Sequence, residues 1–230
     1  MLAGGRGTRL APVVDDRAKV LADVGGRPFL GYLLDQLVQA GCPRIVLCTG
    51  YRGDEVRAAV GDRHRGVPIA YSHEPSPAGT GGALRLMAAA TSDDPVLVLN
   101  GDSYCEVDLA ALWARHRARG AAATMVVAEV ADTARYGRVD LGADGRVAGF
   151  REKGPERRPG WINAGLYVVA RARLLAVPAG RPVALEAEVL PTWVAAGLDA
   201  FPTRGCFFDI GTPRDYAGAA TLLEGQGMTP

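Results

Sequence analysis

The sequence has very little lysine, since only Lys19 and Lys153 among its 26 basic residues are not arginine. Coding bias towards arginine is the simplest explanation. The 230 residues carry 26 basic and 25 acidic side chains, which excludes a strongly basic nucleic-acid binder and an acidic disordered chain as the default interpretation. A lysine ammonium is a compact charge and a guanidinium is a planar fork, so the two positions are not equivalent to arginine at a tight phosphate site.

Long apolar runs and clustered cysteines are also missing. No apolar run approaches the ~20 residues that a membrane span requires, and the opening MLAGGRGTRL lacks the apolar core of a signal peptide. The four cysteines are widely spread and form no Cys-x-x-Cys pair, which argues against a zinc site or a disulfide framework. We therefore expect a cytoplasmic protein that binds neither nucleic acid nor membranes.

Apolar runs alternate with helix-period segments through the first half of the chain. The expected strands are 44–49, 95–100 and 121–128, and the expected helices are 29–40, 54–60, 82–90 and 108–118. Asp108 is expected to cap the last of these helices, and Gly41 and Gly120 to end helices. This alternation predicts an α/β fold with a mostly parallel sheet sandwiched by helices, which binds ligands beyond the carboxyl ends of its strands.

The second half is richer in strands. Residues 138–141 and 146–150 flank the sequence Gly-Ala-Asp-Gly, which predicts a hairpin closed by an Asp-Gly turn. A strand at 163–169, a helix at 185–196, two short strands and a helix at 213–223 follow. The linker-like stretch 154–160 is too short to separate independent domains. We predict one domain over residues 1–224 and a frayed C-terminal tail at 225–230.

A glycine-rich segment, LAGGRGTRL at residues 2–10, opens the chain. Glycine lets backbone N–H groups approach an anion without a Cβ in the way, and Arg9 would add a bidentate phosphate contact. The segment is neither a GxGxxG motif nor a Walker loop, so an ordinary glycine-rich turn is the alternative. Lys19 follows ten residues after Arg9, where a solvated surface charge is the alternative.

A series of segments, in order, resembles the sugar-1-phosphate nucleotidylyltransferases. The first is the Gly-rich turn ending in Thr-Arg-Leu and followed by a lysine. The others are YSHEPSPAGTGGA at 71–83, LNGD at 99–102, YG at 136–137, FREK at 150–153, INAGLY at 162–167 and FDIGTP at 208–213. The short length, the GTGGA loop and the FDIGTP ending look most like heptose-1-phosphate guanylyltransferases. The resemblance implies a Rossmann-like, glycosyltransferase-A-like fold with a small β-rich sugar-binding part.

The reaction of this family joins a nucleoside triphosphate to a sugar 1-phosphate and releases pyrophosphate. The attacking phosphate oxygen is already anionic, so the protein must align two polyanions and stabilise developing charge rather than supply a nucleophile. The resemblance implies catalytic roles for Arg9, Lys19 and Asp102, with Arg9 on the departing phosphates and Lys19 at the reaction centre. It also implies that Asp102 and Asp209 hold Mg²⁺.

The resemblance implies contacts with both substrates along the chain. Nucleotide contacts are implied for Leu2, Ala3, Gly4, Gly5, Gly7, Thr8, Glu74, Gly79, Thr80 and Gly101. Sugar-phosphate contacts are implied for Gly137, Glu152, Lys153 and Asn163. The alternatives are that Asp102 and Asp209 cap turns or helices, and that Glu152 and Lys153 form a solvated pair at a strand end.

Glu74 carries the inference about the base. A carboxylate only accepts hydrogen bonds, and guanine offers it two adjacent donors, N1–H and the 2-amino group. Adenine presents an acceptor at N1, and uracil and thymine offer one donor flanked by carbonyls. Thymidylyl-transferring relatives resemble this loop but carry glutamine there. GTP is therefore the expected nucleotide, provided that Glu74 faces the base.

Two features depart from the family pattern. The family usually has proline before the signature lysine, whereas Ala18 precedes Lys19 here. A full parallel strand normally precedes the Leu-Ala-Gly-Gly turn, whereas only Met1, Leu2 and Ala3 are available. We expect either a stub of a first strand or a protein that starts further upstream.

Other functions stay open from the residues alone. One is a mannose-1-phosphate or other hexose-1-phosphate nucleotidylyltransferase. Another is a non-catalytic nucleotide-sugar-binding regulatory protein, which would not need the metal pair. A glycosyltransferase commonly places its metal through Asp-x-Asp, a spacing that Asp93 and Asp94 lack. The residues leave the oligomeric state open, and a homodimer is compatible with them.

Overall fold

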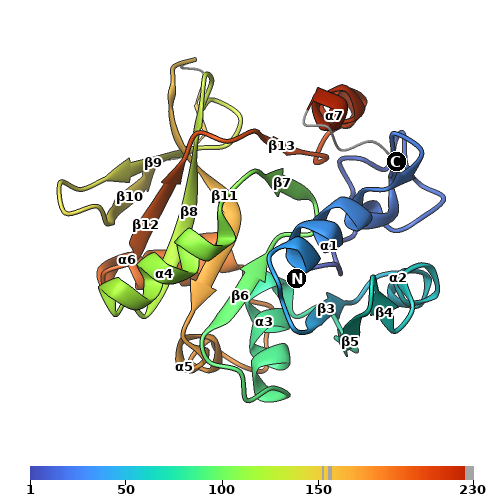
Figure 1. The fold of residues 1–230 in the computed structure, drawn as a ribbon, viewed down its shortest axis with the longest axis horizontal. Coiled ribbons are helices and arrows are strands. Elements are labelled where there is room, and N and C mark those ends of the chain that lie inside the picture. The colour runs from blue at the N-terminus through green and yellow to red at the C-terminus, as the bar shows by residue number, and fades with distance from the viewer. Residues whose placement is uncertain (152, 155–156, 226–230) are drawn as a thin grey trace. The chain divides into compact units, whose positions relative to one another are not determined.

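The computed structural model describes residues 1–151, 153–154 and 157–225. The chain forms two compact units (Figure 1). The first contains Met1–Pro77, Asn100–Tyr104 and the described residues from Phe208 onward, and the second contains Ala78–Leu99 and Cys105–Phe207. Each unit is thus assembled from segments far apart in the sequence. The single domain over residues 1–224 stays a prediction, and the predicted tail lies outside the described residues from 226 onward.

The first unit is built around a short parallel pairing. Strand β3 (Ile45–Thr49) runs parallel to β5 (Val67–His73), and β4 (Arg63–His64) pairs antiparallel with β5. The other elements are η1 (Lys19–Leu21), the hairpin of β1 (Asp23–Val24) and β2 (Arg27–Pro28), and helices α1 (Phe29–Gln39), α2 (Gly53–Val60) and α7 (Pro213–Gly225). Helix α1 buries residues at helical spacing: Phe29, Leu30, Leu33, Leu34 and Leu37.

The second unit contains a mixed sheet in the order β10-β9-β11-β8-β12, with β6 also paired to β11. The strands are β6 (Val96–Leu99), β8 (Ala123–Val130), β9 (Arg138–Leu141), β10 (Val147–Arg151), β11 (Gly160–Val169) and β12 (Asp199–Thr203). Helix α4 (Leu109–Arg119) packs on β8, β11 and β12 (Figure 1). The remaining elements are α3 (Gly79–Ala89), α5 (Arg171–Leu175), η2 (Leu185–Val189) and α6 (Leu190–Ala195).

Two short strands lie where the chain passes between the units. Strand β7 (Ser103–Cys105) pairs with β13 (Phe207–Asp209). Within the first unit, the rings of Tyr104 and Phe208 stack at 5.4 Å between centroids. The pairing therefore sets Asp102 and Asp209 on neighbouring segments of the first unit.

The structure confirms the α/β class and most predicted elements. The predicted strand at 44–49 is β3, the helix at 108–118 is α4, and the predicted hairpin is β9 and β10. The expectation of a mostly parallel sheet needs correction. Strand β11 lies antiparallel to β6, β8 and β9, and β12 alone pairs in parallel within the described part of this sheet.

The helix expected at 185–196 is divided in two. Residues Leu185–Val189 form a π-helical turn and Leu190–Ala195 form α6. Pro191 sits in the first turn of α6, and it has no N–H to donate to an earlier carbonyl. A continuous α-helical ladder is therefore interrupted at this point. No helix in the described part of the chain is long and apolar enough to cross a membrane.

Helix α4 begins and ends at residues that the sequence predicts, and a polar contact holds it to the sheet. The Asp108 carboxylate accepts a hydrogen bond from the Ala111 N–H at 2.9 Å, and Gly120 ends the helix in the left-handed conformation, as predicted. On its inner face, His116 Nδ1 lies 2.9 Å from the Thr124 hydroxyl, and burial lowers the pKa of this histidine. The helix is thus held to β8 by a polar contact as well as by apolar packing.

A buried carboxylate joins α4 to the sheet edge. The side chain of Asp199 on β12 is 2% exposed, and its oxygens accept hydrogen bonds from Arg115 Nε at 3.0 Å and Arg119 Nε at 3.2 Å. The two arginines are one helical turn apart, so both reach the same carboxylate. Burial of this acid is offset by two charged donors.

We expect Asp199→Ala to lower the free energy of unfolding by about 2 kcal/mol, because two charged hydrogen bonds to a buried acceptor are lost. Urea denaturation measures this change. The control is Glu129→Gln, which removes an exposed pair with Arg204 in the same unit and should cost less than about 0.5 kcal/mol. Equal losses in the two variants would contradict this account of Asp199.

Candidate active site

The start of the chain lies between two segments of the first unit, the end of β3 and the residues that begin with Asn100. Leu2 forms parallel bridges to both Cys48 and Asn100. Ala3 is buried and donates its N–H to the carbonyl of Cys48 at 2.8 Å. A Cβ placed on Gly101 would lie 2.2 Å from the carbonyl oxygen of Leu2, so only glycine permits this approach. These residues set the glycine-rich turn at the carboxyl end of β3.

The glycine-rich turn presents its polar residues to solvent. Gly5, Thr8 and Arg9 are exposed, so a phosphate could reach them from solvent. Gly7 has a φ of +62°, and a Cβ there would lie 2.9 Å from the Cβ of Lys19. Because Gly7 lacks that atom, the turn packs directly against the lysine stem. The structure thus brings two of the predicted elements, the turn and Lys19, into contact.

Lys19 contacts one of the two predicted metal ligands, Asp102, and lies near the other, Asp209. Its Nζ donates to Asp102 Oδ2 at 2.6 Å, with side-chain exposures of 10% for the lysine and 40% for the acid. The Ile210 N–H donates to the carbonyl of Asp102 at 2.9 Å, which places Asp209 on the adjacent segment. A Cβ on Gly211 would lie 2.5 Å from Asp209 Oδ1 and 3.8 Å from Lys19 Nζ. One ammonium and two carboxylates therefore converge.

The donor set of this cluster suits Mg²⁺. Asp102 and Asp209 supply carboxylate oxygens, and Mg²⁺ commonly takes one or two protein carboxylates together with phosphate oxygens and waters. No group of three or more histidine, cysteine or acidic side chains with metal-binding spacing occurs in the part of the chain that the structure describes. A two-carboxylate site that phosphate oxygens complete is the metal site that these residues fit.

Glu74 lies at the same end of the parallel strands as the glycine-rich turn. Its N–H donates to the carbonyl of Thr49 at 2.9 Å, directly after β5. A Cβ on Gly50 would lie 2.5 Å from Glu74 Oε1, and a Cβ on Gly4 would lie 2.8 Å from the Gly50 nitrogen. Gly50 therefore lies between the half-buried Glu74 carboxylate and the glycine-rich turn. The first unit by itself carries both the predicted base contact and the predicted phosphate contacts.

Gly79 and Thr80 open α3 in the second unit. Gly79 has a φ of +74°, and a Cβ there would lie 2.4 Å from the carbonyl oxygen of Val183. The Thr80 hydroxyl accepts from the Leu185 N–H at 2.7 Å and donates to Glu186 Oε2 at 3.2 Å. Both residues thus join α3 to η2 and the segment before it. Their nucleotide contacts stay predictions.

Asn163 lies at an irregularity of β11. The register between β11 and β8 shifts between Asn163 and Tyr167. The Asn163 side chain donates to Tyr167 Oη at 2.7 Å and accepts from the Gly165 N–H at 3.0 Å. Tyr167 is fully buried, and burial raises its pKa. Strand irregularities of this kind often redirect side chains near active sites. Here the two hydrogen bonds of the Asn163 amide stabilise the irregular part of β11.

The other predicted sugar residues lie on connecting segments of the second unit. Gly137 has a φ of +77° and donates its N–H to the carbonyl of Thr133 at 3.1 Å, just before β9. Lys153 is exposed beyond the end of β10. Glu152 lies outside the described residues. The sugar-phosphate contacts of all these residues stay predictions.

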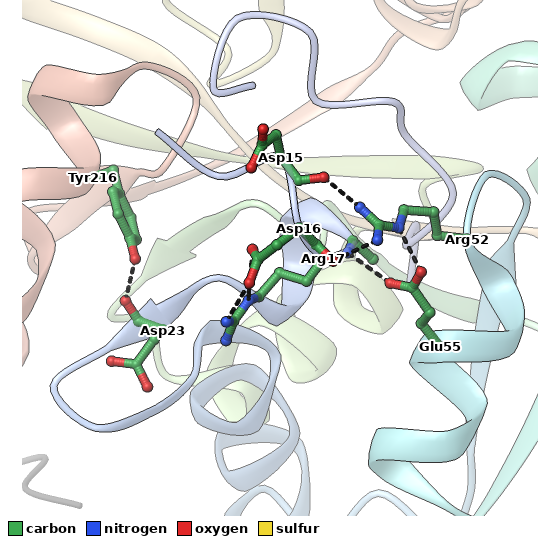
Figure 2. Close-up of polar contacts among 8 residues, drawn as sticks. Asp15, Asp16, Arg17, Asp23, Arg52, Glu55 and Tyr216 are labelled. Atoms are coloured by element: carbon green, nitrogen blue, oxygen red, sulfur yellow. Dashed lines mark hydrogen bonds and ion pairs between the residues drawn. The ribbon is translucent and has the colours of Figure 1, made fainter. Parts of the chain in front are cut away.

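Sequence reasoning missed two kinds of residue in the first unit. Gly50 and Gly211 lie against Glu74 and Asp209, and a glycine alone carries no chemical signal. Arg52 and Glu55 contact the segment before Lys19 (Figure 2). Their spacing of three residues at a helix start was the available signal, but it usually marks only a local ion pair.

Sequence comparison places this chain among nucleotide-transferring enzymes. Residues 1–226 match the family model described as nucleotidyl transferase. D-glycero-alpha-D-manno-heptose 1-phosphate guanylyltransferase of Aneurinibacillus thermoaerophilus is 33% identical, over 97% of this chain and 97% of the relative. Mannose-1-phosphate guanylyltransferase of Mycobacterium tuberculosis is 35% identical, over 100% of this chain and 66% of the relative. The chain thus spans just under two thirds of the mannose relative.

Solved structures agree with the sequence comparison. HddC from Yersinia pseudotuberculosis, complexed with GMP-PN, has a TM-score of 0.85 and 33% identity, over 96% of each chain. A putative glucose-1-phosphate thymidylyltransferase from Bacillus anthracis shares the fold, with a TM-score of 0.83 and 24% identity. The predicted resemblance to sugar-1-phosphate nucleotidylyltransferases is confirmed, and the chain belongs to the nucleotidyl transferase family.

Proposed function

We propose that the protein transfers GMP from GTP to a sugar 1-phosphate, specifically a heptose 1-phosphate, and releases pyrophosphate. The observation that carries this proposal is the convergence of Lys19, Asp102 and Asp209 beside the glycine-rich turn. A cation and two carboxylates at a turn with exposed glycines suit the phosphates of a nucleotide with its metal. The relatives with guanylyltransferase names support the same reaction class.

The chemistry needs no nucleophile from the protein. An oxygen of the sugar phosphate attacks the α-phosphorus in line, a new P–O bond forms, and the bond to the β-phosphate oxygen breaks. Pyrophosphate leaves with that electron pair. We assign Lys19 to the phosphates at the reacting centre and the exposed Arg9 to the departing β- and γ-phosphates. Asp102 and Asp209 would hold Mg²⁺, which neutralises phosphate charge when bound.

Glu74 supports guanine as the base. Its carboxylate lies over Gly50, which in turn lies against Gly4 of the phosphate turn. The adjacent ends of β3 and β5 therefore carry an acceptor-only side chain next to the glycine-rich turn. A carboxylate there suits the N1–H and 2-amino donors of guanine and opposes the N1 acceptor of adenine.

The heptose relative supports heptose over mannose as the sugar. This chain and that relative each cover 97% of the other, whereas the mannose relative contains a further third that this chain does not match. Mannose 1-phosphate remains the second candidate because that relative is 35% identical over the whole chain. We further propose that residues 1–224 act as one catalytic domain in the cytoplasm, as a homodimer.

Purified protein should release pyrophosphate much faster with GTP than with ATP, UTP, CTP or dTTP. The physical reason is that the other bases cannot offer the Glu74 carboxylate the two adjacent donors that guanine offers, and such a mismatch commonly costs a factor of about 100 or more. The measurement is a matrix of nucleotides against heptose, mannose and glucose 1-phosphates with Mg²⁺. Equal use of ATP would contradict the base assignment, and faster turnover of mannose 1-phosphate would favour the second candidate.

Replacing Asp102 with alanine should abolish most pyrophosphate release, by a factor of about 100 or more, because the metal site and the partner of Lys19 are both lost. Nucleotide binding, measured by calorimetry, should partly survive. Chelation of Mg²⁺ should reproduce the loss in wild-type protein. Asp62→Asn, an exposed acid of the same unit, is the matched control. Full turnover by Asp102→Ala would show that this carboxylate is not catalytic.

Replacing either lysine with arginine should lower the rate of nucleotidyl transfer. Lys19→Arg keeps the charge but places a planar fork in a space that Gly7 and Asp102 fit to a narrow stem, so kcat should fall about tenfold or more. Lys153→Arg should also lose activity if it contacts the sugar phosphate. Arg57→Lys, the reverse exchange on the exposed face of α2, is the control. Wild-type rates in both lysine variants would mean that the positions are a compositional accident.

A further inference from the structure

The segment before Lys19 is held from one side by two residues at the start of α2. Arg52 Nη1 donates to the carbonyl of Asp15 at 2.7 Å, and Arg52 Nη2 donates to the carbonyl of Asp16. Arg52 Nε donates to Glu55 Oε1 at 2.5 Å. Figure 2 shows this guanidinium between the Glu55 carboxylate and the backbone of residues 15 and 16. Three nitrogens of one side chain thus bind three oxygens.

Glu55 completes the attachment on the other side. Its second oxygen, Oε2, accepts the N–H of Ala18 at 3.2 Å. Ala18 is the residue immediately before η1, which begins with Lys19. The carboxylate therefore joins the guanidinium of Arg52 to the backbone that leads into the lysine. We call Arg52 and Glu55, with their bonds to residues 15, 16 and 18, the α2 clasp.

The backbone at Arg52 gives an independent sign that its side chain is used. Arg52 has a φ of 56° and a ψ of 30°, a left-handed conformation that favours glycine. Among the described residues, Arg65 is the other non-glycine residue with positive φ. The chain keeps arginine at a position where glycine would be less strained. The contacts to Asp15, Asp16 and Glu55 offset that strain.

The clasp fixes the point from which Lys19 starts. The lysine stem lies against Gly7, and its ammonium binds Asp102, so its far end is already held. The position of the Lys19 backbone depends on Ala18, the preceding residue, whose methyl side chain makes no polar contact of its own. Without the clasp, rotation about the Ala18 backbone would move the ammonium relative to Asp102. Small displacements of a catalytic group cost much more rate than binding.

We propose that Arg52 and Glu55 are positioning residues that clasp residues 15–18 to α2 and thereby hold Lys19 against Asp102. The catalytic consequence rests on the proposed nucleotidyl transfer, but the clasp itself is a property of the folded chain. Neither residue touches the phosphates in this scheme. Their removal should therefore lower kcat more than it raises the KM for GTP.

The conformation of Ala18 provides a rescue experiment. Ala18 has a φ of −60° and a ψ of 138°, which proline adopts without strain. Proline at position 18 would fix φ covalently, but it would remove the N–H that Glu55 accepts. Ala18→Pro should thus make Glu55 partly dispensable. A residue that merely stabilised α2 could not be replaced by a proline in another segment.

The test compares Glu55→Ala with the double variant Ala18→Pro/Glu55→Ala. We expect Glu55→Ala to lower kcat about tenfold with less than about a threefold change in KM for GTP, and the double variant to recover most of the loss. The matched control is Asp54→Asn, which removes a neighbouring acid from the same first turn of α2 and should keep wild-type kinetics. Wild-type kcat in Glu55→Ala, or no recovery on adding proline, would overturn the proposal.

A readout without turnover separates the clasp from the proposed reaction. Amide hydrogen exchange across residues 10–22 should become faster in Glu55→Ala and stay slow in Asp54→Asn. Unchanged exchange in Glu55→Ala would overturn the clasp even if activity fell. Faster exchange in a protein that turns over no nucleotide would leave the clasp standing and reject the proposed function. If Glu55→Ala fails to fold, Glu55→Gln, which keeps one acceptor oxygen, should give an intermediate loss, and wild-type exchange and kcat in it would overturn the clasp.

Arg52→Gly sharpens the distinction between positioning and stability. Glycine relieves the left-handed strain but cannot reach residues 15, 16 or 55. We expect the midpoint of thermal unfolding to stay within about 3 °C of wild type while kcat falls about tenfold. A loss of activity that appears only together with a large loss of stability would instead assign Arg52 a purely structural role.

Discussion

The contact between Lys19 Nζ and Asp102 Oδ2 is the interaction on which the rest of the site depends. The two residues are 83 positions apart, and their distance is 2.6 Å. Such an approach requires close packing of backbone around them. Gly101 lets the chain pass the carbonyl of Leu2, and Gly7 lets the glycine-rich turn pack on the lysine stem. These two glycines therefore permit close contacts between segments, a role that is separate from the nucleotide contacts predicted for them.

The scarcity of lysine has a physical meaning at this site. The narrow lysine stem fits between Gly7 and Asp102, and its compact ammonium suits the phosphate contact that we propose for it. Arginine has a different structural role at another position of the same unit. Arg52 uses its planar fork to reach two backbone carbonyls and a carboxylate at once, which a lysine cannot do. The two cations thus have separate roles in the same unit.

The sequence predicted the elements that show periodic apolar spacing or a characteristic capping residue. The helical periodicity of residues 29–40 predicted α1, and Asp108 predicted the start of α4. The antiparallel direction of β11 could not be predicted in this way, because a buried strand is apolar whichever direction it runs. The clasp was also invisible, since Arg52 and Glu55 bind backbone groups of residues 15, 16 and 18, which every sequence possesses. The convergence of Asp102 and Asp209 could be expected only from the resemblance.

The clasp and a proline restrict the same backbone angle by different means, and the difference matters. A proline fixes φ in the folded and the unfolded chain alike, so its rigidity needs no other part of the molecule. The hydrogen bond from Ala18 to Glu55 exists only when α2 is folded and Arg52 holds the carboxylate. In this chain, order in the segment before Lys19 is therefore coupled to order in α2. Arg52 and Glu55, which bind each other and the backbone before the lysine, thereby help to place it.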